Sequence, residues 1–285
     1  MAGSGFGTNF RITTWGETHG AGVGVVVDGC PAGLPLERED VQKYLDRRKP
    51  GQSKYTTQRK EGDQVEILSG IFEGRTTGTP ISMVVYNKDQ RSKDYSNIKD
   101  IYRPGHADFT FDMKYGFRDY RGGGRSSGRE TIGRVAAGAV AAKVLKELGI
   151  EIKAYAKAIA GIEVSKDHFD FAEMNNNPFN MPDKEAAKLV QEKADQMIKE
   201  MDSIGGIIEC QITGMPVGIG ETVFDKLDAE LSKAIMSIGS VKGFEIGDGF
   251  EAANLRGSEN NDDFICVDGK VEKETNHSGG VLGGM

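Results

Sequence analysis

The chain has 285 residues, a net charge of −7 and 39 glycines, about twice the roughly 7% glycine of an average protein. With 38% apolar and 28% charged residues it is not a disordered chain, and glycines without a three-residue period exclude collagen. The negative balance excludes a generic polyanion binder.

The chain starts with neither a basic stretch nor an apolar one, and it contains no run near the roughly 20 apolar residues that a membrane helix needs. Its cysteines, Cys30, Cys210 and Cys266, are far apart, and neither they nor the four histidines have the spacing of metal ligands. We therefore expect a cytoplasmic protein with no disulfide framework, metal or membrane partner.

Hydrophobic periodicity predicts strands and helices along the whole chain. In chain order we expect a strand at residues 23–27, a helix at 36–48, strands at 65–68 and 81–86, a long turn-rich stretch at 87–125, a helix from 127 to about 148, a strand at 150–162, a helix at 183–201, a strand at 207–213, a helix at 224–238 and a strand at 264–267. The order predicts a single α+β domain over residues 1–285.

Three details of these elements can be tested against a structure. Ser127 and Glu130 match a capping box at the start of the long helix, and Gly149 matches its C-terminal stop. Alternation predicts that Ile208, Cys210 and Ile212 point inward from their strand. Helical spacing predicts the same for Leu227, Leu231, Ile235 and Ile238.

The positive charge is concentrated in the first half of the chain. Residues 1–134 have a balance of +4 and residues 135–285 a balance of −11, and 13 of the 14 arginines lie in the first part. The arginine fork binds phosphate and carboxylate in a bidentate manner. Each arginine alone fits a solvated surface charge, but the set favours an anion site.

The strongest local signal is the run Arg121-Gly-Gly-Gly-Arg125-Ser126-Ser127 before the long helix. Glycines permit close approach of the backbone, and the free amides of a first helical turn bind anions. Arg129 lies one turn beyond Arg125 and can face the same ligand. The spacing is not that of a Walker A loop, and a simple turn with a helix cap is the alternative.

Two histidines stand in glycine-containing loops, His19 in residues 16–20 and His106 in residues 103–108. Such positions suit proton transfer near neutral pH, although a solvated loop histidine is the alternative. His168 and His277 lack this context. Further basic or glycine-rich loops lie at residues 46–59 and 276–284.

Taken together, the motifs at residues 16–20, 55–59, 89–92, 103–108, 121–130, 241–250 and 276–284 resemble those of chorismate synthase, in family order. The resemblance implies a β-α-β sandwich, with helices layered between antiparallel sheets, assembled as a homotetramer. It also implies a lyase of aromatic amino-acid biosynthesis in the shikimate pathway. This lyase converts 5-enolpyruvylshikimate 3-phosphate to chorismate and phosphate by anti 1,4-elimination with reduced FMN, for which NADPH is a possible reductant.

The resemblance also implies roles for individual residues. His19 would protonate the departing phosphate and His106 would act on the reduced flavin. The implied substrate-binding residues are Arg48, Arg103, Ser127 and Arg129, and the implied flavin-binding residues are Arg48, Lys54, Arg125, Ser126, Ser127, Gly239, Ser240 and Gly283.

The chain departs from the family pattern at three places. Thr18 replaces the usual serine, and Lys54 stands where many members have arginine. Family members continue past the position of Met285 with a further flavin-binding segment, so we expect the C-terminal part of the family domain to be absent here. Two other functions stay open: a phospho-anion or RNA-binding module, although we expect no nucleic-acid partner, and a flavin-dependent reductase.

Overall fold

The computed structural model describes residues 3–56, 61–88 and 99–285. The chain divides into two compact units, Met1–Met215 and Pro216–Met285, and each is described by itself. The single-domain organisation expected from the sequence stays a prediction.

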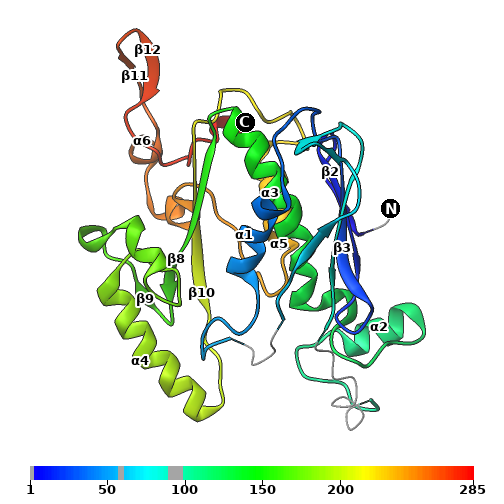
Figure 1. Cartoon of the computed structure of the whole chain (residues 1–285). Helices are drawn as coiled ribbons and strands as arrows, with labels where there is room; N and C mark the ends of the chain where they lie inside the picture. The colour runs from blue at the N-terminus through cyan, green and yellow to red at the C-terminus, as the bar shows by residue number, and fades with distance from the viewer. Residues whose placement is uncertain (1–2, 57–60, 89–98) are drawn as a thin grey trace. The chain divides into compact units, whose positions relative to one another are not determined.

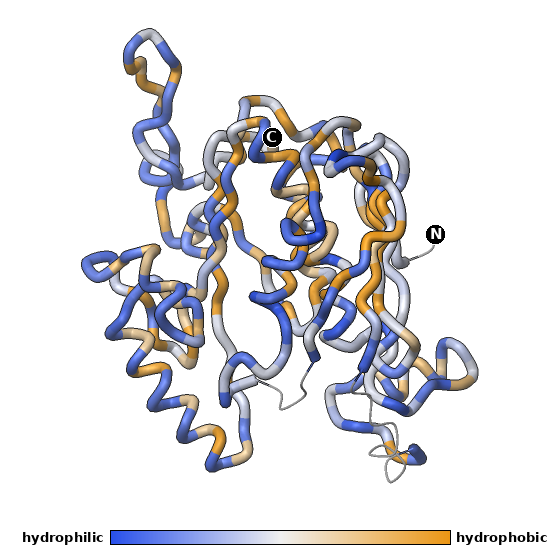
Figure 2. Tube along the Cα trace, in the orientation of Figure 1, coloured by the Kyte–Doolittle hydropathy of each residue, from blue (hydrophilic) through white to orange (hydrophobic). Residues whose placement is uncertain are grey.

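The first unit contains a five-stranded antiparallel sheet with the strand order β1-β2-β3-β7-β4. Its strands are β1 (Gly5–Phe6), β2 (Arg11–Gly16), β3 (Gly22–Asp28), β7 (Ile81–Tyr86) and β4 (Val65–Ile67). Val25 of the central strand β3 lies opposite Thr14 on one side and Met83 on the other. The strands of this sheet are rich in apolar residues (Figure 2). The central strand β3 is buried along nearly its whole length. A small hairpin, β5 (Ile71–Phe72) and β6 (Arg75–Thr76), follows β4.

Two helices, α1 (Arg38–Arg48) and α3 (Thr131–Glu147), pack on this sheet and against each other. Leu45 of α1 and Val140 of α3 are fully buried in the shared core. Gly133 lets α3 approach β3 closely, since a Cβ at this position would lie 3.0 Å from the carbonyl oxygen of Gly24. Both helices lie between the five-stranded sheet and the second sheet of this unit (Figure 1), so the expected sandwich of helices between antiparallel sheets is confirmed.

The second sheet has the order β10-β8-β9, with β8 (Glu151–Ile159), β9 (Ile162–Glu163) and β10 (Gly206–Thr213). Helix α4 (Lys184–Glu200) is capped by Asp183 and packs on it through Val190 and its neighbours. The strand expected at residues 150–162 is broken after Ile159, because Ala160 and Gly161 adopt positive φ and form a tight turn.

Three further predictions in this unit were wrong in detail: the burial of one face of β10, the absence of a helix from the turn-rich stretch at residues 87–125, and the capping box of α3. Ile208, Cys210 and Ile212 are not buried as expected: all three are exposed, Ile208 to 68%. The stretch at residues 87–125 contains helix α2 (Asp108–Tyr115). This helix has no amphipathic pattern by which it could be predicted, because its aromatic residues Phe109 and Tyr115 are exposed.

The capping box at the start of α3 does not form. Ser127 instead caps a short 3-10 helix, Gly128–Glu130, by accepting a hydrogen bond from the Arg129 backbone N–H. The carboxylate of Glu130 accepts hydrogen bonds from Thr14 on β2 and from Arg134 instead of turning back to the backbone. Other short 3-10 helices are Gly124–Ser126, Lys166–His168 and Phe171–Asn175.

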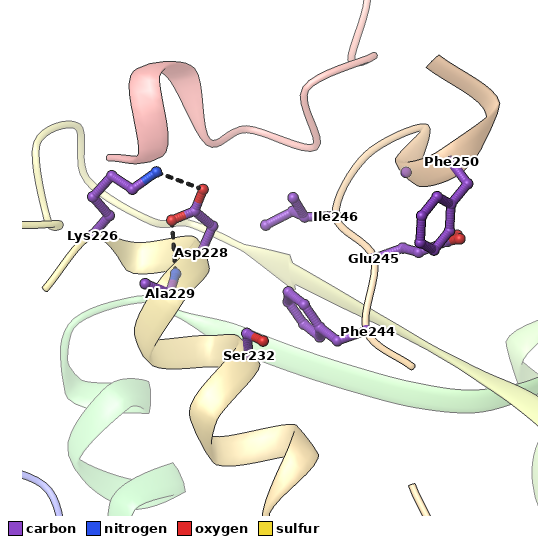
Figure 3. Close-up of a pocket in the computed structure, with 9 residues that line it drawn as sticks. Lys226, Asp228, Ala229, Ser232, Phe244, Glu245, Ile246 and Phe250 are labelled. Atoms are coloured by element: carbon purple, nitrogen blue, oxygen red, sulfur yellow. Dashed lines mark hydrogen bonds and ion pairs between the residues drawn. The ribbon is translucent and has the colours of Figure 1, made fainter. Parts of the chain in front are cut away.

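The second unit holds helices α5 (Leu227–Met236) and α6 (Gly257–Asn260), the hairpin of β11 (Phe264–Val267) and β12 (Lys270–Lys273), and the 3-10 helices Gly249–Asn254 and Leu282–Gly284. The residues expected on the inner face of α5 are half-buried. Lys226, Ser232, Phe244 and Phe250 are among the residues that line a hollow of about 500 Å³ beside α5 (Figure 3).

A buried carboxylate, Asp262, organises the glycine-rich segment of this unit. It accepts hydrogen bonds from the Thr275 hydroxyl at 2.6 Å, the His277 N–H at 2.7 Å and the Ser278 N–H at 3.0 Å, and it pairs with Lys273 at 3.1 Å. Burial alone would raise its pKa, but these bonds outweigh burial and hold the pKa of Asp262 well below its usual range.

Candidate functional site

His19 lies in the loop between β2 and β3 and is only 9% exposed. The glycine run of residues 122–124 packs directly on its ring. A Cβ at Gly122 would lie 2.8 Å from His19 Cδ2, and the φ of Gly122 is +71°. Both facts require glycine at position 122. The contact brings the predicted motif at residues 16–20 against the one at residues 121–130.

The hydroxyl of Thr18, next to His19, is buried, and its Oγ1 has no hydrogen-bond partner within the described part of the chain. A buried polar atom without a partner is unfavourable unless a ligand or water satisfies it. The Thr18 side chain therefore offers a hydroxyl for a polar ligand beside the histidine.

His106 and Arg103 both contact the carboxylate of Asp108, the first residue of α2. Arg103 grips it with two nitrogens, Nε and Nη2, at 2.8 Å each, and His106 Nδ1 lies 3.0 Å from Asp108 Oδ1. The hydrogen bonds from Arg103, more than any other cause, hold the pKa of Asp108 far below its usual range. Asp108 is therefore ionised at neutral pH and fixes both side chains.

Gly122 joins this group to His19. Arg103 Nη2 donates to the carbonyl oxygen of Gly122 at 2.7 Å, while the α-carbon of the same glycine faces the His19 ring. One residue of the glycine run thus contacts both the Arg103 and the His19 side chains. The two candidate catalytic histidines, from separate loops, belong to one connected group.

Arg48 and Arg129 meet at a second buried carboxylate, Asp63. Arg48 Nη1 lies 3.0 Å from Asp63 Oδ2 and Arg129 Nη1 lies 2.9 Å from Asp63 Oδ1, and the Asp63 side chain has 0% exposure. Arg129 Nη2 is buried without a hydrogen-bond partner in the described residues, since Glu61 Oε2 stands 3.8 Å away. The arginine pair therefore keeps a donor for an anion.

Asn87 connects the arginine pair to the His19 loop. Its Nδ2 donates to the carbonyl oxygens of Glu17 at 2.9 Å and Gly20 at 2.8 Å, and its Oδ1 accepts from Arg129 Nε at 2.7 Å. Arg48, Arg129, His19, Arg103 and His106 thus belong to one network of hydrogen bonds, ion pairs and packing contacts.

Asp119 adds an acidic group to this region. Arg121 pairs with it at 2.6 Å and, with a smaller contribution from the charge of His19, lowers the pKa of Asp119.

Among residues 3–56, 61–88 and 99–285 there is no cluster of His, Cys, Asp or Glu that could hold a metal. In the same residues, no helix is long and apolar enough to cross a membrane.

Comparison with known proteins shows the family of this chain. The chorismate synthase family model matches residues 10–285. The chain belongs to the chorismate synthase family. The chorismate synthase of Lachnospira eligens is 70% identical over 285 residues, and that of Agathobacter rectalis is 65% identical, each match covering 100% of this chain and 78% of the relative. A crystal structure of chorismate synthase has a TM-score of 0.81 at 32% identity, covering 97% of this chain and 81% of the other.

The residues with flavin roles in the chorismate synthase pattern are only partly brought together. Ser127 Oγ accepts from the Arg129 backbone N–H at 3.2 Å, and Ser126 Oγ donates to Gly123 O at 2.7 Å. The Arg125 side chain turns toward β2, where it donates to Gly16 O at 3.0 Å and to Thr14 Oγ1 at 2.6 Å. In this structure Arg125 braces the His19 loop, and its contact with flavin stays a prediction.

Lys54 pairs with Asp195 of α4 at 2.7 Å, and this aspartate also accepts from Tyr55 at 2.9 Å. The other predicted flavin ligands, Gly239, Ser240 and Gly283, lie in the second unit, where Ser240 and Gly283 adopt positive φ of 71° and 64°. Residues 57–59 and 89–92, which carry two of the family motifs, lie outside the described residues.

Sequence reasoning missed the residues that join the site. Asn87 and Asp63 carried no motif signal, because an asparagine after a strand and an acid in a polar loop are common. Asp108 stood inside the motif at residues 103–108 but was given no role. Arg118, whose Nη1 lies 3.1 Å from Asp108 Oδ1, was also missed. The available signal was the concentration of arginines in residues 1–134, since any of them that is buried needs an acidic partner.

Proposed function

We propose that the network around His19, Arg129 and His106 is the active site with which the chain forms chorismate. As a member of the chorismate synthase family the chain is a lyase of the shikimate pathway that converts 5-enolpyruvylshikimate 3-phosphate to chorismate and phosphate. The roles of single residues, the flavin site and the assembly are proposals.

The observation that carries the proposal is that two buried polar atoms, Arg129 Nη2 and Thr18 Oγ1, have no hydrogen-bond partner within the described residues. Both can donate a hydrogen bond, and both belong to the network that contains His19. A substrate with a phosphate and two carboxylates supplies the oxygen acceptors that such donors need. We assign Arg48, Arg129 and Ser127 to binding these groups, with Arg103 beside them.

His19 is assigned as the general acid. The elimination breaks the bond between carbon and the phosphate oxygen, so a proton delivered to that oxygen stabilises the leaving group. A buried imidazole that packs against the glycine run can deliver the proton from a fixed position. His106, held by Asp108, is assigned to proton exchange with the flavin.

Members of this family require reduced flavin. When bound, reduced FMN supplies a redox-active ring that accepts the hydrogen leaving the substrate, in a reaction that is redox-neutral overall. A Cβ at Gly239 or Gly283 would meet nothing within 4 Å, so each of these backbones is open to close approach by a ligand. From the family resemblance, Arg48, Lys54, Arg125, Ser126 and Ser127 of the first unit are proposed as flavin contacts. Gly239, Ser240 and Gly283 of the second unit carry the same proposed role, from the resemblance alone. NADPH is proposed as reductant, a homotetramer as assembly and the cytoplasm as location, all from the family resemblance.

The test is chorismate formation under anaerobic conditions, from 5-enolpyruvylshikimate 3-phosphate and FMN reduced beforehand. We expect chorismate and phosphate in equal amounts, with none when FMN stays oxidised. Consumption of one NADPH per turnover would instead indicate a flavin-dependent reductase. An RNA complex whose affinity falls steeply with salt, without chorismate formation, would indicate an RNA-binding module. Absence of product with reduced FMN would overturn the proposal.

A further inference from the structure

A chain of side-chain hydrogen bonds joins the residues just before α3 to strand β2. Arg125 Nη2 donates to Thr14 Oγ1 at 2.6 Å, and Thr14 Oγ1 donates to Glu130 Oε1 at 2.8 Å. A guanidinium can only donate, and a hydroxyl has one hydrogen. Because Thr14 accepts from Arg125, its single hydrogen serves the carboxylate of Glu130. The bonds therefore run in one direction, from Arg125 through Thr14 to Glu130.

Both ends of this chain of hydrogen bonds are held by further contacts. Arg125 Nη1 donates to the carbonyl oxygen of Gly16 at 3.0 Å, and Arg125 Nη2 reaches the carbonyl oxygen of Thr14 at 3.2 Å. Glu130 Oε2 accepts from Arg134 Nε at 2.9 Å, in the first turn of α3. Thr14 is 6% exposed and the Glu130 side chain 13% exposed, so water competes little for these bonds.

The two segments that Arg125 joins are those on either side of His19. Gly16 is the last residue of β2, and His19 follows it by three residues. Gly122, which packs on the His19 ring, precedes Arg125 by three residues. Arg125 thus links the end of the strand before the His19 loop to the glycine run that covers the imidazole. If Arg125 turned away, these two segments would lose their direct side-chain link.

We propose that Thr14 and Glu130 are positioning residues for the reaction, which orient Arg125 and thereby fix the imidazole of His19. The proposal rests on the proposed function, in which His19 delivers a proton to the leaving phosphate. Thr14 and Glu130 act through Arg125 and the backbone. Misplacing a reacting group by about 1 Å can lower a rate about 10²-fold, so a small rotation of the His19 ring is enough to slow the elimination.

The first test is NMR of the full chain labelled with ¹⁵N-histidine. Only four histidines contribute signals, and His19→Gln identifies those of His19. Glu130→Gln keeps the size of the side chain but has a single oxygen, so either Thr14 or Arg134 loses its acceptor. We expect the His19 ring signals to shift in Glu130→Gln. Unchanged His19 signals in the folded variant would overturn the proposal.

The second test separates a positioning role from a structural one by steady-state kinetics. Thr14→Val removes the hydroxyl and keeps the branched shape, so kcat should fall about 10–10²-fold while the KM for 5-enolpyruvylshikimate 3-phosphate stays within about twofold of wild type. Thr14→Ser keeps the hydroxyl and should recover most of the kcat. Thr13→Val is the matched control, because Thr13 is the exposed neighbour on the other face of β2; it should keep kcat and the His19 signals.

The outcomes decide between three roles for these side chains. A Thr14→Val variant with a lower Tm but wild-type kcat would show that the hydroxyl is only structural, and would overturn the proposal. A change confined to FMN affinity, measured by flavin fluorescence, would overturn it too, because Arg125 would then be oriented for flavin. If Thr14→Val does not fold, Glu130→Gln carries the same kinetic expectation. The spectra need no turnover, so a chain that forms no chorismate would refute the proposed function and leave the link from Glu130 to His19 standing.

Discussion

Asp63→Asn tests whether the buried ion group at the arginine pair holds the site together. The carboxylate of Asp63 has 0% exposure and contacts Arg48 at 3.0 Å and Arg129 at 2.9 Å. Asparagine has nearly the same shape, but its single oxygen can accept from only one arginine. Its amide then directs N–H groups at the other, and both guanidinium charges lose their counter-charge.

Breaking one buried pair by removing a partner costs about 3–5 kcal/mol. For domains of 150–250 residues, each kcal/mol lowers Tm by about 2–4 °C. We therefore expect Asp63→Asn to lower the Tm by roughly 10 °C, measured by scanning calorimetry at neutral pH. Since Arg48 and Arg129 lose their fixed direction, the KM for 5-enolpyruvylshikimate 3-phosphate should rise in the same variant.

Asp28→Asn is the matched control. Asp28 pairs with Arg11 at 2.9 Å on the surface, where both side chains are about half-exposed. An exposed pair contributes about 0–1 kcal/mol, so this variant should keep its Tm within about 2 °C and keep its KM. If Asp63→Asn behaved like Asp28→Asn, the assignment of Asp63 as the residue that holds the two arginines would be wrong.

Three further predictions concern the same network. Gly122→Ala should lower kcat/KM by about 10²-fold, because the new Cβ displaces the His19 ring. Gly116 also has positive φ, but its Cβ would meet nothing within 4 Å, so Gly116→Ala should lose only about 1–2 kcal/mol of stability. Equal activity in both variants would contradict the packing of Gly122 on His19. Arg129→Lys should raise the KM for substrate about tenfold, because one ammonium cannot serve both neighbours of the guanidinium, whereas Arg11→Lys should leave it unchanged; a wild-type KM in Arg129→Lys would exclude it from substrate binding. Because the folded-state pKa of Asp108 is held below that of the unfolded chain, its stabilising contribution is complete above about pH 4 and is lost as the pH falls further. The Tm measured from pH 6 to pH 3 should therefore fall less in Asp108→Asn than in wild type. Parallel curves would count against Asp108 as an ionised partner of Arg103.

The elements with clear periodicity were predictable. The strand at residues 23–27 and the helix at residues 36–48 match β3 and α1 closely, because each has an apolar pattern set by burial on this core. Helix α2 was not predictable, since it exposes Phe109 and Met113 and has no apolar face. The burial expected for Ile208, Cys210 and Ile212 of β10 was wrong, because alternation marks one face of a strand without showing whether anything covers it.

The site was predictable as a set of residue types and not as a set of contacts. The arginines and the two histidines stood out by charge and by their glycine neighbours. The connections depend on Asn87 and Asp63, and on the backbone of Gly122, which meets His19 and Arg103 only in the folded chain. The Glu130 side chain shows the same limit: its local pattern predicted a helix cap, but Thr14 and Arg134 bind it instead.

Phosphate release in a single anaerobic turnover, compared between the wild-type chain and His19→Ala, tests most directly whether this network eliminates phosphate. With FMN reduced beforehand, we expect one phosphate per chorismate from wild type. His19→Ala should bind substrate with similar affinity but release phosphate about 10²–10⁴-fold more slowly. Phosphate released by His19→Ala at the wild-type rate would contradict the role of His19, and no phosphate from the wild-type chain would contradict the account as a whole.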